Sequence, residues 1–388
     1  MTPRPRLLLH IGTEKTGTTA IQEYCRLNSN RYAELGVIIP DYLGWSNHSL
    51  FTCCFYSDAR KDEMALKHGM NSLEERSRKR SETLSRLIQH TLCHPEGTFL
   101  ISSEHLHSRL TNEEEIESLA RFLSPLFDSV TIVLYIRKPI DTAISAWSTG
   151  VKCGLTGTSL PSPSNPYIHN LCMHKESILR WSNYFGESNL CVRLFRRDAL
   201  FKNDLIHDFV ESCGIGFSSD MIIPPKTNEK LGLDGILFLA EVNKVLPLII
   251  DNKPNPVRGN IANYFSKHFS DSPAYIPSED EVLSYSSYYN HSDLWVKDNY
   301  FGHLDSLWGE ESRFPMVQAK NDNLIWDADI KSDSRLGYSP ESVSRLLTLL
   351  SQVWVDKSHR IISLESENLR LMDELSQLKK SIILDEQD

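Results

Sequence analysis

Four short apolar runs, each followed by a stretch of helical character, constrain the fold of this chain most strongly. The runs are Leu7–Ile11, Thr98–Ser102, Val130–Ile136 and Leu190–Phe195. Each is rich in aliphatic or β-branched residues and is bounded by polar or turn residues, which is typical of buried parallel strands. The helices expected after them are Thr18–Leu27, Glu113–Leu123, Asp141–Thr149 and Leu200–Ser212. This alternation predicts an α/β fold, a three-layer sandwich around a central parallel sheet, with ligands beyond the carboxyl ends of the strands.

Length and charge narrow the class of protein further. The 388 residues are enough for one large domain with additions, and the formal net charge of −10 disfavours nonspecific binding to nucleic acid or anionic lipid. The apolar run after Arg4 and Arg6 ends at His10, which is too short for a secretory signal. No stretch approaches the roughly 18 apolar residues that span a bilayer. We therefore expect no membrane span, no nucleic-acid partner and a cytoplasmic location.

Eight cysteines are spread along the chain without a C-x-x-C pair or a Cys/His cluster of zinc spacing. Cys53 and Cys54 are adjacent, and metal binding there is the less favoured alternative. The pattern indicates small buried hydrophobic residues in a reducing compartment. No metal site is expected.

The segment Gly12-Thr13-Glu14-Lys15-Thr16-Gly17-Thr18-Thr19 connects the first expected strand to the first expected helix. Free amides at a helix N-terminus bind phosphate, and glycines let the backbone approach it closely. Gly12 and Gly17 have the spacing of the ATP/GTP phosphate loop, but Thr18 stands where that motif requires lysine. The lysine lies inside the loop instead, at Lys15. The segment therefore predicts a phosphate-binding loop that is not of the ordinary ATPase kind.

A second candidate phosphate contact follows the third strand. Arg137-Lys138-Pro139 come directly after it, and Ser145 lies eight residues beyond Arg137. Arginine presents a planar fork of donors that matches a phosphate. Asp141 is expected to be the N-cap, which would place Ser145 one turn into the next helix.

These two elements resemble those of the sulfotransferases that use 3′-phosphoadenosine 5′-phosphosulfate (PAPS), particularly bacterial and carbohydrate sulfotransferases. The run Lys15-Thr16-Gly17-Thr18-Thr19 resembles their 5′-phosphosulfate loop, and Arg137 with Ser145 resembles their 3′-phosphate element. The resemblance covers roughly residues 6–235. It implies PAPS as co-substrate, adenosine 3′,5′-bisphosphate (PAP) as product, and transfer of a sulfuryl group to an acceptor. The implied nucleotide-binding residues are Lys15, Thr16, Gly17, Thr18, Thr19, Arg137 and Ser145, with Lys15 also acting catalytically on the leaving group.

This sequence differs from the cytosolic sulfotransferases in two places. Ala20 stands where many of them have a tryptophan that packs on adenine. Asn228-Glu229-Lys230-Leu231-Gly232 is similar to a later loop that covers the nucleotide, although the relatives are more basic and glycine-rich there. Lys230 is therefore a further candidate phosphate contact.

Sulfuryl transfer also needs a base that takes the proton of the acceptor. Glu104, just after the strand Thr98–Ser102, is the first candidate, although it could instead cap a helix or pair with a cation. His48 is the second candidate. His105 is the third, and strand alternation would turn it away from the cleft. The implied acceptor is a hydroxyl of a glycan or another small molecule, and its identity stays open.

The expected organisation is a sulfotransferase domain over 1–310, an irregular and helical region over 311–354, and a coiled-coil-like helix over 355–388. Apolar residues occupy a and d positions of a heptad repeat at Ile361, Leu364, Leu371, Leu375, Leu378 and Ile382. Asn368 at an a position favours two parallel strands. This predicts a homodimer through the helix, whereas the alternative is a helix packed on its own domain.

Two other function classes stay open. A kinase or ATPase related to the phosphate-loop enzymes would need a lysine at position 18 and ligands for Mg²⁺. A catalytically inactive, sulfotransferase-like scaffold would bind partners through the C-terminal helix. Thr18 opposes the first class, and the presence of Lys15, Arg137 and Ser145 opposes the second.

Overall fold

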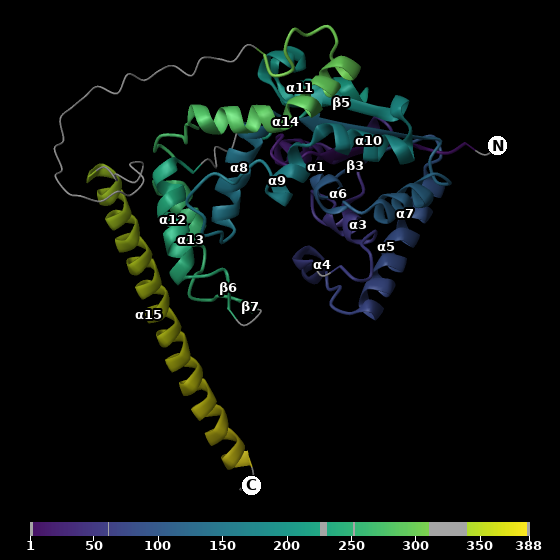
Figure 1. Ribbon diagram of the computed structural model, residues 1–388. Helices are drawn as coiled ribbons and strands as arrows, with labels where there is room; N and C mark the ends of the chain where they lie inside the picture. Colours follow the sequence, from purple (N-terminus) through teal and green to yellow (C-terminus); the bar gives the residue numbers. More distant parts are fainter. Residues whose placement is uncertain (1–2, 61, 226–230, 251–252, 310–339, 386–388) are drawn as a thin grey trace, which may run out of the picture. The chain divides into compact units, whose positions relative to one another are not determined.

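The computed structural model describes residues 3–60, 62–225, 231–250, 253–309 and 340–385 (Figure 1). Contacts within the chain divide it into two compact units. Unit 1 comprises 1–147, 160–227 and 277–320, and unit 2 comprises 148–159, 228–276 and 321–388. This division differs from the domains expected from the sequence, because residues 228–276 belong to unit 2 and not to one domain with the rest of 1–310. The domain limits 1–310, 311–354 and 355–388 stay a prediction.

Unit 1 contains a five-stranded parallel sheet. Its strands are β1 (Arg6–Gly12), β2 (Val37–Ile38), β3 (Thr98–Ser102), β4 (Ser129–Ile136) and β5 (Leu190–Leu194), in the order β2-β3-β1-β4-β5. The four predicted strands are confirmed, with ends that differ by one residue at most. The chain leaves central β1 towards β2 and β3 on one side and later passes to β4 and β5 on the other. The carboxyl end of β1 is therefore where this topology favours a ligand.

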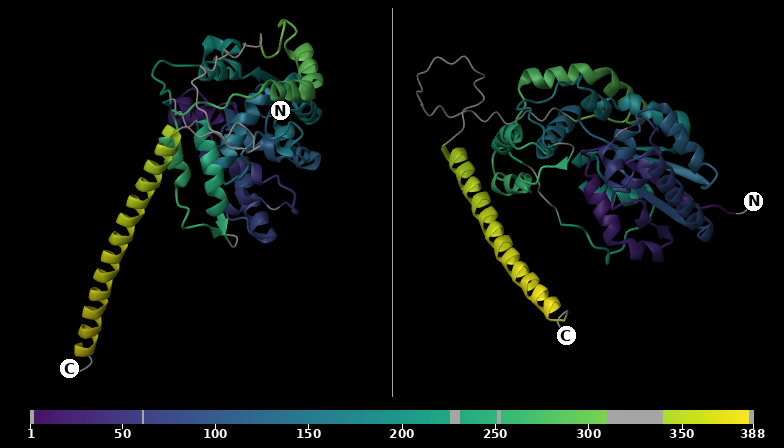
Figure 2. Two further views of the ribbon diagram at one scale, coloured as in Figure 1. Left: turned by 60° about the vertical axis from the view of Figure 1, so that its left-hand side comes forward. Right: turned by 90° about the horizontal axis from the view of Figure 1, so that it is seen from below.

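Alternate residues of β1 enter two different cores, so helices cover both faces of the sheet (Figure 2). Leu8 lies in the core formed with α1 (Thr18–Leu27), α2 (Ser29–Glu34) and α11 (Leu205–Cys213). Leu7, Leu9 and Ile11 lie in the other core. That core includes residues of α3 (Ser49–Cys53), α5 (Leu73–Cys93), α6 (Glu104–Arg109), α7 (Glu113–Leu123), α10 (His174–Phe185) and α14 (Glu279–Tyr300). The predicted three-layer α/β fold is confirmed.

The expected helices Thr18–Leu27 and Glu113–Leu123 have the predicted bounds, but two others begin elsewhere. Helix α8 (Pro139–Lys152) begins at its proline, which is favoured at the first helical position because its missing amide needs no partner there. Asp141 is therefore inside the first turn, and its expected role as N-cap was wrong. Helix α11 begins at Leu205, after the 3₁₀ turns η3 (Arg197–Ala199) and η4 (Phe201–Asn203), and Asp204 caps it.

Further short elements complete unit 1. They are α4 (Glu63–Lys67), α9 (Pro166–Cys172) and the 3₁₀ turns η1 (Asp41–Leu43) and η2 (Glu187–Asn189). Asn165 caps α9 through its side chain.

Unit 2 contains α12 (Leu233–Val245), the hairpin strands β6 (Ile249–Ile250) and β7 (Lys253–Pro254), α13 (Ile261–His268) and α15 (Pro340–Asp385). Buried Asn243 donates to the carbonyls of Val151 (2.8 Å) and Leu155 (2.7 Å) and accepts from Arg258 (2.6 Å). The expected C-terminal helical extension is confirmed, although it begins at Pro340. Across the residues that the structure describes, no helix is both long and apolar enough to cross a membrane.

Candidate functional site

The predicted phosphate loop connects β1 to α1 and is held in a tight curve. Gly12, Lys15 and Gly17 have φ values of 104°, 69° and 79°. The Thr16 hydroxyl donates to the Thr13 carbonyl (2.6 Å), and the Thr13 amide donates to the Tyr135 carbonyl on β4 (2.8 Å). No side chain caps α1 at Gly17. The first amides of α1 therefore keep the donor capacity that makes a helix N-terminus an anion site.

Both glycines of the loop are required by close packing as well as by positive φ. A Cβ at Gly17 would lie 2.4 Å from Leu205 Cδ2 and 3.2 Å from Phe195 Cε2. A Cβ at Gly12 would lie 3.1 Å from the Cα and Cβ atoms of Glu104. Glu104 therefore packs directly against the phosphate loop.

Arg137 follows β4 and joins the second predicted phosphate element to the first. Its Nη1 donates to the Lys15 carbonyl (2.9 Å), and its guanidinium lies 5.6 Å from the centre of the Phe195 ring. Its own carbonyl lies 3.0 Å from His174 Nε2. Burial lowers the pKa of Arg137, while the Asp141 carboxylate raises it, and a guanidinium stays charged in any case. Because a guanidinium has five N–H donors, this cation keeps donors for an anion.

The remaining predicted nucleotide contacts lie on α1 and α8. Thr18 is buried and Thr19 is exposed in the first turn of α1. Ser145 is half-buried in the second turn of α8, and within the described residues it hydrogen-bonds to neither Arg137 nor the loop. Asn228, Glu229 and Lys230 lie outside the described residues.

Glu104 is the first residue of α6, just beyond the end of β3. Its Oε2 accepts from Gln22 Nε2 on α1 (2.5 Å), and its Oε1 lies 3.8 Å from His105 Nε2. The side chain is 14% exposed. Its hydrogen bond goes to Gln22 and not to a helix amide, so the structure does not support the capping alternative. The arrangement orients a carboxylate beside the phosphate loop.

The two candidate histidines differ in how their rings are engaged. His48 is buried, and its Nδ1 accepts from the Ser102 amide (2.9 Å), so the proton of the neutral ring sits on Nε2. Burial lowers its pKa to about 4. This ring has no lone pair left with which to accept a proton from an acceptor.

His105 lies on α6, so the helix and not strand alternation sets its orientation. Its Nε2 contacts Asn47 Nδ2 (3.3 Å), in addition to lying near Glu104. Its buried Nδ1 has no hydrogen-bond partner in the described part of the chain.

Sequence reasoning missed two contributors to this site. Gln22 is buried on α1, four residues after Thr18, and that spacing places both on one helix face. This was a usable signal. Tyr167, in contrast, donates its hydroxyl to Glu14 of the loop from a segment more than 150 residues away, which no local pattern reveals.

The cysteines form no disulfide, and the described residues contain no candidate metal site. All eight cysteines are unpaired, and Cys53 and Cys54 are buried. Over the described ranges, no group of three or more His, Cys, Asp or Glu residues is placed to hold a metal ion.

Comparisons with known proteins give a weak likeness to solved structures. None of the protein-family models and none of the curated proteins compared with the chain matches it. Among solved structures, a sulfotransferase from Alicyclobacillus acidocaldarius matches with a TM-score of 0.34 and 15% identity, over 62% of this chain and 94% of that chain. A TM-score of this size is too low to assign a fold or a function.

Proposed function

We propose that this protein is a PAPS-dependent sulfotransferase that transfers a sulfuryl group to an acceptor hydroxyl. One observation carries the proposal: Arg137 donates to the Lys15 carbonyl at 2.9 Å. This bond joins two phosphate elements that lie 122 residues apart in the sequence. A nucleotide that carries a phosphate at the 3′ position and another at the 5′ position of its ribose requires two phosphate-binding elements.

Each element has a role in binding the nucleotide. The amides at the start of α1 and the segment Lys15–Thr19 bind the 5′-phosphosulfate. Arg137 and Ser145 bind the 3′-phosphate. The Thr16 hydroxyl is already engaged with the Thr13 carbonyl, so it contributes mainly to the shape of the loop. Lys15 and Arg137 supply the positive charge for this binding.

The transfer is an in-line displacement. The acceptor oxygen forms a bond to sulfur, and the bond between sulfur and the bridging 5′-phosphate oxygen breaks. Glu104 takes the proton of the acceptor hydroxyl, while Lys15 stabilises the charge that develops on the departing PAP. The packing of Glu104 against Gly12 supports this assignment, because it holds the base next to the loop that binds the leaving group.

Calorimetry with PAP and with ATP, each in a metal chelator, tests the nucleotide assignment. We expect PAP to bind and ATP to bind much more weakly. Tight binding of ATP with Mg²⁺, without binding of PAP, would instead favour a kinase or ATPase. Mass spectrometry of an acceptor library incubated with PAPS then tests turnover. PAP binding without any sulfated product would favour an inactive scaffold.

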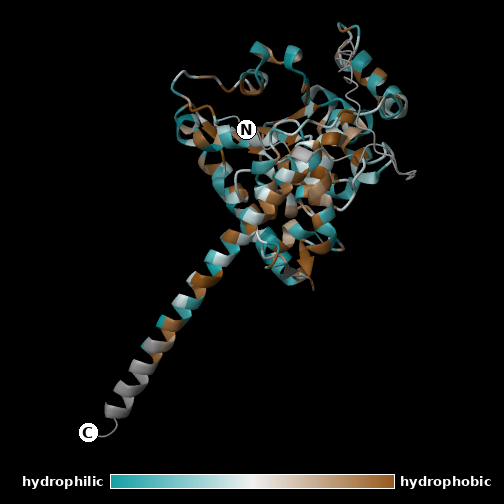
Figure 3. Cartoon of the chain, turned by 90° about the vertical axis from the view of Figure 1, so that its left-hand side faces the viewer, coloured by the Kyte–Doolittle hydropathy of each residue, from teal (hydrophilic) through white to brown (hydrophobic). Residues whose placement is uncertain are grey.

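We also propose a homodimer formed through α15. The described side chains of the heptad stripe are exposed: Ile361 by 56%, Leu364 by 50%, Leu371 by 49% and Leu375 by 56%. Figure 3 shows hydrophobic residues recurring along this helix. A second copy of the helix would bury the stripe and pair the Asn368 amides. Two active sites on one particle would suit a polymeric glycan.

The cellular location that fits this function is the cytoplasm. Five of the eight unpaired cysteines are buried, which suits a reducing compartment.

A further inference from the structure

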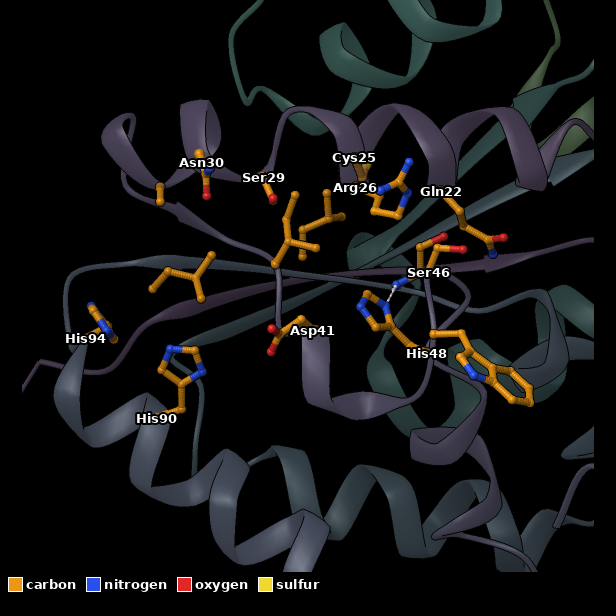
Figure 4. A pocket seen from close by; sticks show the side chains of 16 residues that line it. Gln22, Cys25, Arg26, Ser29, Asn30, Asp41, Ser46, His48, His90 and His94 are labelled. Atoms are coloured by element: carbon orange, nitrogen blue, oxygen red, sulfur yellow. Dashed lines mark hydrogen bonds between the residues drawn. The ribbon is translucent and has the colours of Figure 1, made fainter. Parts of the chain in front are cut away.

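A cavity of about 550 Å³ lies in unit 1 beside the candidate base. It is bounded by α1 and α2, the segment 38–48, the C-terminal part of α5 and the floor of β3. Figure 4 shows Gln22, Ser46 and His48 at one end of it, Asn30 and His94 towards the other, and Asp41 between them. Its volume lies within the roughly 300–1,000 Å³ range of sites for drug-sized ligands.

One end of the cavity is connected to Glu104 by a single hydrogen bond, through Gln22. Gln22 lines the cavity and donates to the Glu104 carboxylate (2.5 Å). Ser102 also lines it, and its amide donates to His48 (2.9 Å) two residues before Glu104. A molecule that fills this cavity therefore has one end against Gln22, the hydrogen-bond partner of the proposed base, although Glu104 itself is not among the lining residues.

The charge of the lining disfavours an anionic ligand. Asp41 is the carboxylate among the described lining residues, and Arg26 is the permanent cation. The Arg26 guanidinium is itself paired with Glu23 (2.6 Å). Burial lowers the pKa of His48 to about 4 and also lowers that of His90, so both rings are neutral at pH 7. An anionic acceptor would therefore find no unpaired permanent cation among the described lining residues, while the Asp41 carboxylate can accept hydrogen bonds from hydroxyls.

The polar groups are distributed along the whole cavity and are not confined to one end. Ser29, Asn30 and Ser46 line it, and their side chains make no hydrogen bond within the described part of the chain. Ile38, Ile39 and Leu100 give it an apolar floor. An aromatic alcohol would satisfy polar groups at its hydroxyl end only. A sugar has hydroxyls along its full length and an apolar face, which matches both features.

The loop at the Gln22 end carries backbone strain and an exposed indole. Trp45 and His48 have φ values of 39° and 43°, in the left-handed region that non-glycine residues seldom adopt. Such strain is concentrated at functional sites. It holds Trp45, 59% exposed and part of the cavity lining, against the His68 ring at 4.7 Å.

We propose that this cavity is the acceptor site and that it binds a neutral carbohydrate of about disaccharide size, with Trp45 packing on a sugar ring. The inference rests on the proposed function, because it takes Glu104 as the base. The reacting hydroxyl lies at the Gln22 end, and the distal sugar lies between α2 and the C-terminal end of α5.

Saturation-transfer NMR on the full-length protein with PAP present tests this inference. The probes are cellobiose, maltose, lactose and N,N′-diacetylchitobiose, with 2-naphthol as the aromatic alcohol. We expect at least one disaccharide to bind. Ala33→Trp, which fills the cavity from the exposed face of α2, should abolish its signal, and Trp45→Ala should weaken it several-fold. Glu34→Trp and Trp354→Ala are the matched controls, since both residues are exposed and lie outside the lining.

The outcomes separate this inference from the proposed function. Binding of PAP with no disaccharide binding would overturn the carbohydrate site and leave the nucleotide assignment standing. Binding of 2-naphthol alone, lost in Ala33→Trp, would reassign the cavity to aromatic alcohols. A disaccharide signal that is unchanged in both Ala33→Trp and Trp45→Ala would place the sugar elsewhere. Failure of PAP itself to bind in calorimetry would reject the proposed function.

Discussion

The proposed phosphate side of unit 1, formed by Gly12–Thr19 and Arg137, is built differently from the proposed acceptor side, formed by the cavity beside Gln22. On the phosphate side, glycines, backbone amides and carbonyls define the geometry, and the Arg137 guanidinium bonds to a backbone carbonyl. On the acceptor side, side chains from α1, α2, α5 and the strained loop supply the polar groups. A backbone site suits a group that never varies, such as a phosphate, whereas a side-chain site can be changed to suit different acceptors.

A buried neutral histidine supports the backbone on each side. His174 contacts the Arg137 carbonyl (3.0 Å) on the phosphate side, and His48 accepts from the Ser102 amide (2.9 Å) on the acceptor side. Burial lowers the pKa of both rings to about 4. Protonation would leave the His174 bond to a carbonyl intact, but it would remove the lone pair with which His48 accepts. The acceptor side is therefore the more acid-sensitive of the two.

The largest effect is expected where the two sides meet. Glu104→Gln keeps the shape of the side chain and a partner for Gln22, but it cannot take a proton. Turnover should fall by roughly 10²-fold or more, the usual scale for the loss of a general base, while PAP affinity is retained. Steady-state rates and calorimetry measure the two quantities.

Glu113→Gln, at an exposed position that begins α7, is the control for this variant. Normal turnover in Glu104→Gln would remove Glu104 from its assigned role. A collapse of turnover in His48→Ala or His105→Ala instead would transfer the role to that histidine.

A smaller effect is expected from Arg137→Ala, which acts on the phosphate side alone. Hydrogen bonds to charged groups contribute roughly 1.5–3 kcal/mol, so PAP affinity should fall by about 10- to 100-fold. The PAP affinity of Arg137→Lys should lie between those of the wild type and Arg137→Ala. Lysine keeps the positive charge but lacks the planar set of guanidinium donors. Calorimetry measures the change, with the exposed Arg121→Ala as control. Unchanged affinity in both Arg137→Ala and Lys15→Ala would show that the nucleotide binds elsewhere.

The acid sensitivity of the acceptor side gives a third test. The pKa of His48 is lowered from 6.5 to about 4, so between these pH values the unfolded chain binds a proton that the folded chain does not. Stability therefore falls as the pH drops through this window, by up to about 1.4 kcal/mol per pH unit for this one group. His48→Asn keeps a hydrogen-bond acceptor for the Ser102 amide but does not titrate. The contribution of His48 to the slope of the unfolding free energy against pH should therefore disappear. Urea unfolding at a series of pH values measures it.

His94→Asn is the matched control, since His94 is exposed. A slope that is the same in wild type and His48→Asn would mean that the ring is not held neutral in the folded protein. The test compares the pH dependence of stability and not its value at pH 7. Asparagine is smaller than histidine and leaves a cavity, which lowers stability at every pH.

The strand-turn-helix of the proposed phosphate loop could be predicted from the sequence because its determinants are local. Gly12, Gly17 and the apolar period of Thr18–Leu27 lie within one strand-turn-helix segment. Errors arose where two local preferences competed. Pro139 fixes the start of α8 ahead of Asp141, and the 3₁₀ turns after Arg196 delay α11 to Leu205.

The acceptor side could not be predicted because its contacts join distant segments. The bond between Gln22 and Glu104 spans 82 residues, and the contact between Asn47 and His105 spans 58. Strand β2, which contributes Ile38 to the cavity, has two residues and so no period to detect. The strained loop contains Trp45 and His48 at positive φ without a glycine at either position.

The smallest effect on turnover is expected from removal of the C-terminal helix. A truncation that ends at Lys357 keeps the bond from the Tyr264 hydroxyl of α13 to Asp356 (2.6 Å). It also keeps the contact of Lys357 with the Val257 carbonyl, which lies in the segment before α13. It removes the heptad stripe from Ile361 onwards. Light scattering should report a dimer for the full chain and a monomer for the truncation. Turnover per site on a small acceptor should be unchanged, since neither side of the unit 1 site includes these residues.

A polymeric acceptor should distinguish the two forms, because a second site on the same particle raises the effective concentration for the next transfer. The double variant Leu364→Lys and Leu371→Lys should reproduce the monomer in the full-length chain, because it places charges at two d positions of the stripe. Ser363→Lys with Ser366→Lys, at the c and f positions outside the a, d, e and g positions, is the control for added charge. If full-length protein and truncation share one oligomeric state, the stripe is not a dimer interface.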